Sequence, residues 1–183
     1  MPSRVIHSLR QRLRVTYRNS MLTATLTVGL LGVLFGQSRP KLMPEPKFSV
    51  LSKDDAARLE RQRAVVVAVA KRYSAAPLTG TKSDLPVLQR LIDDKVFTKS
   101  QTYELQCLGA AFGDVLTSEL PLRWVMLTDE YGTDPTLRFK KTALQINPLT
   151  MISKRVERGE HVDVSKLLRI TREQVTQIGP TMR

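Results

Sequence analysis

The sequence predicts an α+β domain in which helices come first, a β-hairpin follows, and two further helices end the chain. The sequence predicts five helices, over residues 52–73, 84–94, 101–119, 148–158 and 164–178. In the last four of them apolar residues recur every three or four positions, as in helices with one buried face. Between the third and fourth of these segments, residues 122–128 and 136–146 carry strand-like apolar runs separated by a turn sequence. We therefore expect a small antiparallel sheet packed on helices.

The first two helices have recognisable starts. Ser52 can cap the free amides of the first turn, and Asp54 and Asp55 suit the positive end of the helix dipole. Residues 64–70 are apolar throughout, as a strand could also be, but the length of the segment and its charged first half favour a helix. Pro86 falls in the first turn of the second helix, where proline is tolerated.

Two glycines inside the third helix require a structural reason. Ser100 is the predicted cap of this helix, and Gly109 and Gly113 lie one turn apart in its interior. Each glycine costs a helix about 1 kcal/mol relative to alanine. We therefore expect another element to approach closely over these two positions. The predicted shared core consists of Leu108, Phe112, Trp124, Ile152 and Leu168.

Turn residues delimit the hairpin. Residues 129–135 form the predicted turn between its strands. In the second strand the apolar positions change parity between Phe139 and Leu144, which predicts a bulge near residues 141–143.

The last two helices are bounded by capping residues. Asn147 and Pro148 are the predicted N-cap and first residue of the fourth helix, and Gly159 ends it. Asp163 is the predicted cap of the last helix.

The N-terminal part is divided into a basic flank (1–20), an apolar segment (21–36) and a Pro-rich linker (37–50), which precede a single globular domain (51–183). As a helix, the 16-residue apolar segment would rise about 24 Å, against a hydrocarbon core of roughly 30 Å. We consider a retained signal anchor, a cleaved signal peptide, and a buried or interfacial helix of a cytosolic protein. By the positive-inside rule, a retained signal anchor would make the chain a single-pass inner-membrane protein with a periplasmic C-terminal domain. Cleavage of a signal peptide would instead release a periplasmic protein.

Charge and composition exclude some function classes. The chain has a net charge of +12, and residues 1–44 hold seven basic and no acidic residues. The remaining domain is only moderately basic, which favours a solvated surface over a nucleic-acid interface. One cysteine, Cys107, and two histidines are too few for an ordinary zinc site, and no cofactor is predicted.

Two groups of residues are candidates for binding. Asp129, Glu130 and Asp134 could hold a hard cation, although they do not match an EF-hand loop, and turn chemistry explains them without a metal. Lys154, Arg155, Arg158 and His161 form the second group.

The second group could hold an anion. Arg155 and Arg158 can share a helix face and contact a phosphate or carboxylate, although a solvated basic face is the commoner arrangement. His161 with Asp163 resembles part of a catalytic pair, but no motif places a serine or cysteine nucleophile. No catalytic residue and no metal ligand is therefore assigned.

Four motifs lie between about residues 85 and 168: Leu105-Gln106-x-Leu108-Gly109-x3-Gly113-Asp114, Trp124-Val125, Asp129-x-Tyr131-Gly132-x-Asp134-Pro135-x-Leu137-Arg138 and Thr150-Met151-Ile152-x-Lys154-Arg155. With these motifs, this part of the sequence resembles a bacterial family known only as a domain of unknown function, the 3806 family. The resemblance implies a bacterial origin and one compact domain, and it brings no activity, cofactor or catalytic residue.

The sequence thus favours a non-enzymatic binding or scaffold domain tethered to the membrane and facing the cell envelope. Its expected partners are the membrane, through the N-terminal segment, and a protein. One alternative is a hydrolase or transferase that uses carboxylates such as Asp129 and Asp134, which would require these residues to converge with His161. Another is an inhibitor-like module that neutralises a partner protein, which would expose a large apolar patch.

Overall fold

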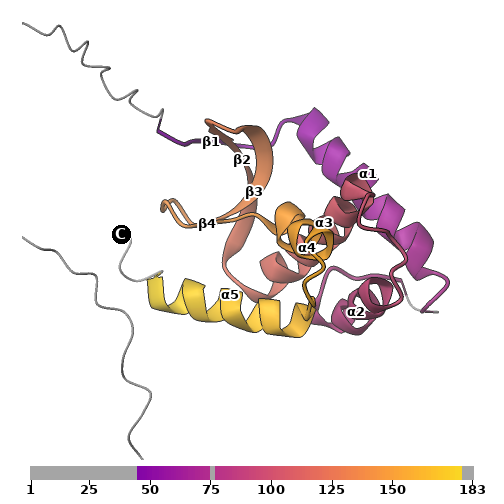
Figure 1. Cartoon of the computed structure of the whole chain (residues 1–183). Coiled ribbons are helices and arrows are strands. Elements are labelled where there is room, and N and C mark those ends of the chain that lie inside the picture. The colour runs from indigo at the N-terminus through magenta and orange to yellow at the C-terminus, as the bar shows by residue number, and fades with distance from the viewer. Residues whose placement is uncertain (1–44, 75–76, 179–183) are drawn as a thin grey trace, which may run out of the picture. The chain divides into compact units, whose positions relative to one another are not determined.

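The computed structural model describes residues 45–74 and 77–178, and they form the predicted α+β fold (Figure 1). In chain order the elements are β1 (Lys47–Ser49), α1 (Lys53–Ala70), the short 3-10 helix η1 (Lys82–Asp84), α2 (Leu85–Asp93), α3 (Thr102–Glu119), β2 (Leu122–Asp129), β3 (Gly132–Phe139), β4 (Gln145–Ile146), α4 (Pro148–Glu157) and α5 (Val164–Ile178). The strands form one antiparallel sheet in the order β1-β2-β3-β4.

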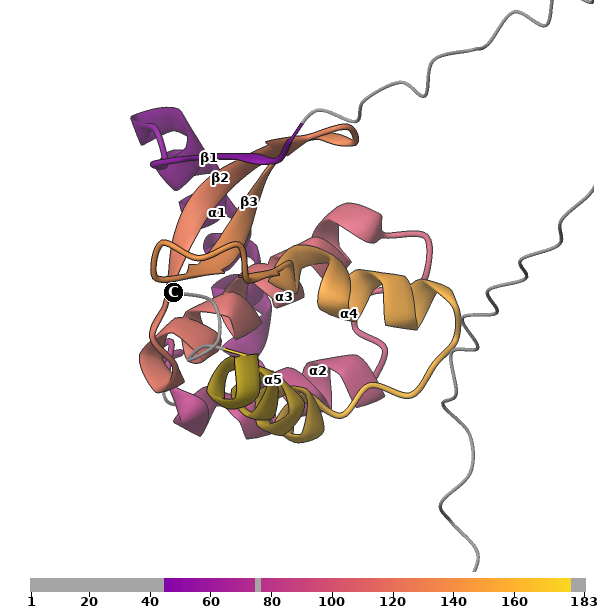
Figure 2. The same cartoon turned by 90° about the vertical axis from the view of Figure 1, so that its left-hand side faces the viewer.

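Helix α3 is the centre of the fold. It contacts α1, α2, α4 and β2, while α2 and α5 lie side by side in both views (Figures 1 and 2). Its large apolar side chains are almost completely buried: Leu105, Leu108, Phe112, Val115 and Leu116. Alternate residues of the sheet join the same core, namely Leu122, Leu137, Phe139 and Ile146.

The predicted close approach over the two glycines of α3 is confirmed. A Cβ at Gly109 would lie 2.7 Å from Cα of Leu149, so the backbone at the start of α4 packs directly on this glycine. A Cβ at Gly113 would lie 2.8 Å from Cη2 of Trp124. The two glycines therefore let α4 and the indole pack against the α3 backbone.

Most predicted helix ends are confirmed. The Ser52 hydroxyl accepts from the Asp55 backbone N–H at 3.1 Å, while the Asp55 carboxylate accepts from the Ser52 N–H at 3.0 Å, so the pair forms a capping box. Asp163 accepts from the Lys166 N–H at 2.8 Å, and Gly159 ends α4 with φ +74°.

One predicted cap is wrong, and another is in the predicted place but forms no side-chain capping bond. The N-cap of α3 is Gln101, not Ser100, and no side-chain cap bond is formed there. The Gln101 side-chain oxygen instead accepts from the Thr98 N–H at 2.9 Å and closes the preceding turn. Asn147 is the N-cap position of α4, but its side-chain oxygen accepts from the Thr136 hydroxyl and so ties α4 to β3.

The sheet differs from the predicted hairpin at both edges. Residues 47–49, assigned to the linker from their sequence, pair with β2, and Arg138 packs over the Phe48 ring at 3.9 Å. Residues 136–146 do not form one bulged strand, because the chain turns after Phe139 and returns as β4. Lys140 has φ +50° in this turn, and Arg138 donates to the carbonyls of Lys141 and Thr142.

The predicted core is confirmed except at one position. Leu108, Phe112, Ile152 and Leu168 are buried, whereas Trp124 is only partly buried. No helix within residues 45–74 and 77–178 is long and apolar enough to cross a membrane. The basic flank and the apolar segment at 21–36 lie outside the described residues.

Candidate functional site

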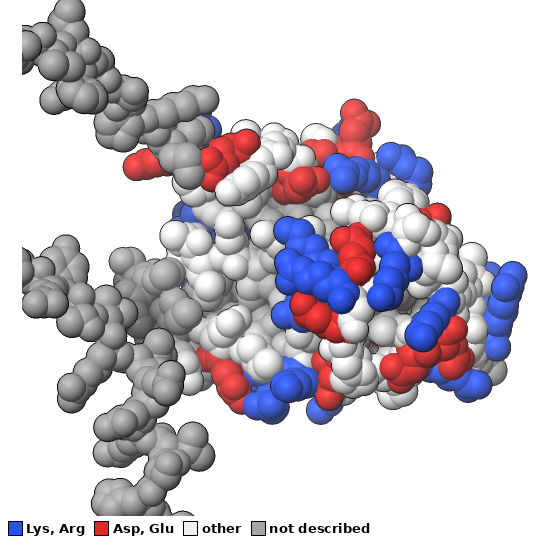
Figure 3. Space-filling model, in the orientation of Figure 1, with Lys and Arg blue, Asp and Glu red and all other residues white. Residues whose placement is uncertain are grey.

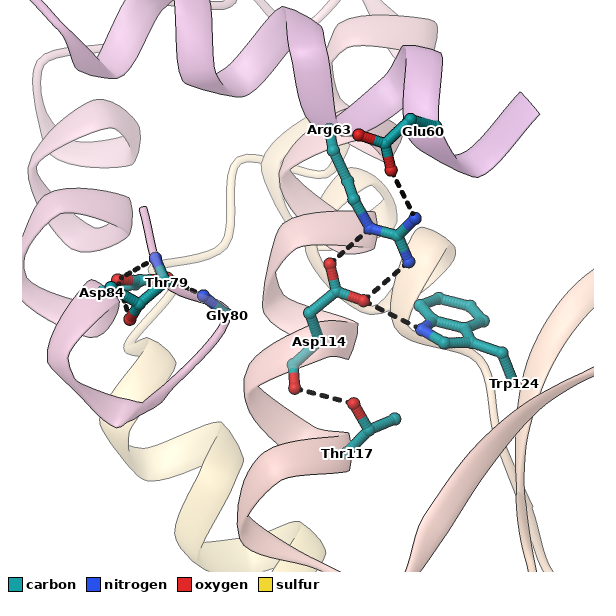
Figure 4. A network of polar contacts seen from close by, with 8 residues as sticks. All are labelled: Glu60, Arg63, Thr79, Gly80, Asp84, Asp114, Thr117 and Trp124. Carbon is teal, nitrogen blue, oxygen red and sulfur yellow. Dashed lines mark hydrogen bonds and ion pairs between the residues drawn. The ribbon is translucent and has the colours of Figure 1, made fainter. Parts of the chain in front are cut away.

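A bidentate ion pair joins two helices that are distant in sequence. Arg63 of α1 donates through Nε to Oδ2 of Asp114 on α3 at 2.5 Å, and through Nη2 to Oδ1 at 2.8 Å. Trp124 of β2 donates its indole N–H to Oδ1 of the same carboxylate at 3.0 Å. Figure 4 shows that these three side chains converge from three different elements. One carboxylate therefore accepts three hydrogen bonds and connects α1, α3 and β2.

The residue before Asp114 explains how the indole reaches it. Gly113 has no side chain, so the Trp124 ring lies against the α3 backbone, where a Cβ would also approach Cγ of Pro148 to 3.0 Å. A larger residue at this position would push the ring outwards and lengthen the bond from the indole to Asp114. The Gly113-Asp114 pair thus acts as one structural unit.

The ion pair is protected from water but not fully buried. The side chains of Arg63 and Asp114 are 27% and 21% exposed. The hydrogen bond to Asp114 raises the pKa of the Arg63 guanidinium above its usual value, although burial opposes this. Glu60 contributes a further contact to Arg63 at 3.2 Å. With two parallel hydrogen bonds and partial desolvation, the pair is stronger than a typical exposed salt bridge.

The connection before α2 is shaped by a buried carboxylate. Asp84 accepts from the backbone N–H groups of Thr79 and Gly80 at 3.0 and 2.7 Å, and from the Thr79 hydroxyl at 3.1 Å. The Thr79, Thr81 and Ser83 hydroxyls also contact one another at 2.7 to 3.1 Å. Gly80 has φ +71°, a left-handed backbone conformation that favours glycine. The carboxylate of Asp84 thus fixes a hydroxyl-bearing loop opposite α3.

These elements enclose a hollow of about 530 Å³, which we name the α1–α3 hollow. Its polar walls include Glu60, Arg63, Thr79, Thr81, Thr117 and Ser118. Val67, Leu78 and Ala111 provide its apolar surface. The volume falls within the range of roughly 300–1,000 Å³ that is usual for small-molecule sites.

The carboxylates singled out in the hairpin turn have structural partners. Asp129 accepts from the Tyr131 N–H at 2.8 Å, which is the expected turn bond, and Asp134 pairs with Arg58 at 3.4 Å. Asp129 and Asp134 both line a small hollow of about 100 Å³, while Glu130 is exposed. Within the part of the chain that the structure describes, no group of three His, Cys, Asp or Glu residues could hold a metal.

The basic residues of α4 do not converge on one point. Arg155 donates to the Met151 carbonyl at 2.6 Å, Arg158 pairs with Glu160 at 3.5 Å, and Lys154 is exposed. Figure 3 shows basic and acidic side chains interspersed over the helical part of the visible face. The arrangement is that of a solvated surface of mixed charge.

His161 lies apart from the turn carboxylates. It lines a third hollow together with Lys95 and Lys99, whereas Asp129 and Asp134 line the small hollow described above. The convergence that a carboxylate-dependent hydrolase would need is therefore not found among these residues.

The Arg63–Asp114–Trp124 network was not predicted from the sequence. Arg63 lies 51 residues before Asp114, in the charged half of α1, and nothing local distinguishes it from Arg58 or Arg61. The available signal was the Gly113-Asp114 pair in the middle of an apolar helix, where a charged residue needs a partner.

The fold and the α1–α3 hollow together define a small α+β domain with a polar hollow between helices. Residues 84–167 match the model of a family described as a domain of unknown function, DUF3806. The predicted resemblance is therefore confirmed. No curated protein matches the sequence.

A solved structure with a similar fold is a crystal structure from Bacteroides thetaiotaomicron at 1.50 Å resolution. The TM-score is 0.63 and the sequence identity is 17%, over 72% of this chain and 48% of the other. The match thus spans about half the length of that protein, and it shows similarity of fold alone.

Proposed function

We propose that this protein is a binding domain held at the bacterial inner membrane by its N-terminal segment, and that the α1–α3 hollow receives its ligand. The observation that supports this most is the Arg63–Asp114–Trp124 network, which positions the wall of the hollow before any ligand arrives. A preformed site avoids the free-energy cost of ordering its side chains on binding.

The same network favours binding over proton transfer. Both oxygens of Asp114 already accept hydrogen bonds, two from the Arg63 guanidinium and one from the Trp124 indole. A carboxylate held in this way is suited to fixing geometry, whereas a general base needs an oxygen free to accept a proton from the substrate.

The walls of the hollow indicate the ligand class. The Thr117 and Ser118 hydroxyls donate to carbonyls of their own helix at 2.8 and 2.9 Å, so their oxygens remain available as acceptors. The Glu60 side chain is 75% exposed and adds a carboxylate at the entrance. We therefore propose a polar ligand that is rich in hydroxyl or amino donors.

The ligand site is tested by filling the hollow. Ser118 is exposed and lines the hollow, so Ser118→Leu should fold normally and obstruct it. Ser165→Leu, at an exposed position on α5, is the matched control. We would screen the full chain against monosaccharides, polyols and diamines by calorimetry. A ligand that binds the wild type and the Ser165 variant, but not the Ser118 variant, supports the proposal, whereas equal binding to all three contradicts it.

The proposed location at the inner membrane depends on the asymmetry of charge around the apolar segment at residues 21–36. Five arginines precede residues 21–36, and the membrane potential opposes their transfer outwards. A periplasm-active reporter fused after Arg183 should be active in a membrane-bound, full-length product. Activity in a shortened soluble product would indicate signal cleavage. A soluble, full-length and inactive fusion would contradict both forms of the proposal.

An inhibitor-like module is supported less well. The large apolar side chains most exposed in the described part of the chain are Val50, Tyr103 and Tyr131. They lie in the β1–α1 connection, on α3 and in the β2–β3 turn, so they belong to three different elements.

A further inference from the structure

A second hollow, of about 550 Å³, lies where α2 and α4 end, and we name it the lysine hollow. It is lined by residues of the segments 92–99 and 156–162, and it shares no residue with the α1–α3 hollow. Its apolar surface comes from Ile92, Phe97, Val156 and Val162, of which Phe97 and Val162 are buried. All of these residues fall within the part of the chain that matches the family.

Lys95 is held at this hollow in a backbone conformation that disfavours it. It has φ +51° directly after α2, where its N–H donates to the Ile92 carbonyl at 3.0 Å and the Val96 N–H donates to the Leu91 carbonyl at 3.1 Å. This is the helix ending that usually selects glycine. The chain keeps a lysine here despite the strain, which points to a use for its side chain.

The end of α4 has the same backbone pattern and makes room for the second lysine. Gly159 has φ +74°, and a Cβ on it would lie 2.8 Å from Nζ of Lys99. A larger residue at 159 would therefore displace the ammonium group, which is the flexible end of the Lys99 side chain. The glycine thus allows Lys99 to lie at the rim of the hollow, beside the end of α4.

The acidic groups at the rim are engaged elsewhere. Asp93 accepts from the Gln89 side chain at 2.9 Å, and Glu160 pairs with Arg158 at 3.5 Å. Within residues 45–74 and 77–178, the side-chain ammonium groups of Lys95 and Lys99 form no hydrogen bond or ion pair. The two ammonium groups complement the negative ends of the α2 and α4 dipoles, and they remain available to an anion.

We propose that the lysine hollow binds an aliphatic carboxylate. The ammonium groups of Lys95 and Lys99 hold the carboxylate, with His161 at the same rim, and the apolar surface takes the hydrocarbon chain. This arrangement of charged rim and apolar interior matches the two ends of such a molecule.

The test compares octanoate with octanol, both below the concentration at which they aggregate, by calorimetry on the full chain. We expect octanoate to bind at least tenfold more tightly than octanol. Lys95→Gly and Lys99→Gln should each weaken octanoate binding about fivefold or more. Lys154→Gln, which removes the same charge from an exposed site on α4, should leave binding unchanged.

Lys95→Gly also separates binding from folding. Because glycine relieves the left-handed strain, this variant should melt at a temperature equal to or above that of the wild type while it loses affinity for octanoate. Equal affinity for octanol and octanoate would overturn the proposal. So would unchanged octanoate binding in Lys95→Gly or Lys99→Gln, or the absence of octanoate binding in the wild type.

Discussion

Replacing Gly113 by alanine tests the close packing on which the Asp114 network depends. At an open position inside a helix, alanine would stabilise the fold by about 1 kcal/mol relative to glycine. At Gly113 the new Cβ would lie 2.8 Å from Cη2 of Trp124 and 3.0 Å from Cγ of Pro148. Ordinary carbon–carbon contacts are roughly 3.5–4.0 Å, so the indole has to move by close to 1 Å.

The magnitude follows from two opposing effects. Overpacking by one methyl group costs about 1–3 kcal/mol, and displacement of the indole weakens its hydrogen bond to a charged acceptor, which is worth up to about 1.5–3 kcal/mol. After subtraction of the gain in helix propensity, we expect a net loss of about 2 kcal/mol. For a domain of this size the melting temperature should fall by roughly 6 °C.

The matched experiment repeats the substitution in a Trp124→Leu background, with stability measured by denaturant and thermal unfolding. There Gly113→Ala should become neutral or stabilising, because the indole is gone. Gly109→Ala should stay destabilising in both backgrounds, because its neighbours are backbone atoms of Pro148 and Leu149. A higher melting temperature for Gly113→Ala in the wild-type background would refute the reasoning.

Three further predictions concern single side chains. Gln62 is fully buried, and neither of its side-chain polar atoms has a hydrogen-bond partner among the described residues. Gln62→Met should therefore raise the free energy of unfolding, measured by urea titration, by about 1–3 kcal/mol, and a loss of stability would contradict this. Burial raises the pKa of the Cys107 thiol to about 11, so Cys107 should resist thiol reagents at pH 8 in the folded protein and react only on unfolding. Rapid labelling of the native protein would show that Cys107 is not buried. The Ser52 hydroxyl and backbone N–H lower the pKa of the Asp55 carboxyl, so the stabilisation by this carboxylate is present above about pH 4 and is lost as the pH falls through the lowered pKa of the folded state. Asp55→Asn should therefore reduce the difference in the free energy of unfolding between pH 7 and pH 2, and an unchanged difference would contradict the capping role.

The elements predicted correctly are those whose signals are local. Ser52 and Asp163 cap helices through residues three positions away, and Gly159 ends α4 through its own backbone conformation. The glycines of α3 also carried usable information, since their helix penalty implied a close neighbour, although not which one.

The features that were missed depend on contacts between distant segments. The strand at residues 47–49 is only three residues long and exists through pairing with β2, about eighty residues later. The turn after Phe139 is held by Arg138, whose side chain reaches back to the carbonyls of Lys141 and Thr142, so an alternation of apolar residues could not distinguish it from a bulge. The partner of Asp114 is on another helix, and the candidate site could not be assembled without the fold.

The most direct test of the proposed function is a map of backbone amide shifts in the labelled full chain as the best ligand from the monosaccharide, polyol and diamine screen is added. The proposal predicts that the largest shifts fall on the hollow's walls, at Thr79, Gly80, Ala111 and Ser118, together with the indole N–H of Trp124. It also predicts that these shifts disappear in Ser118→Leu. Shifts centred on other elements, or shifts that persist in that variant, would show that the α1–α3 hollow is not the binding site.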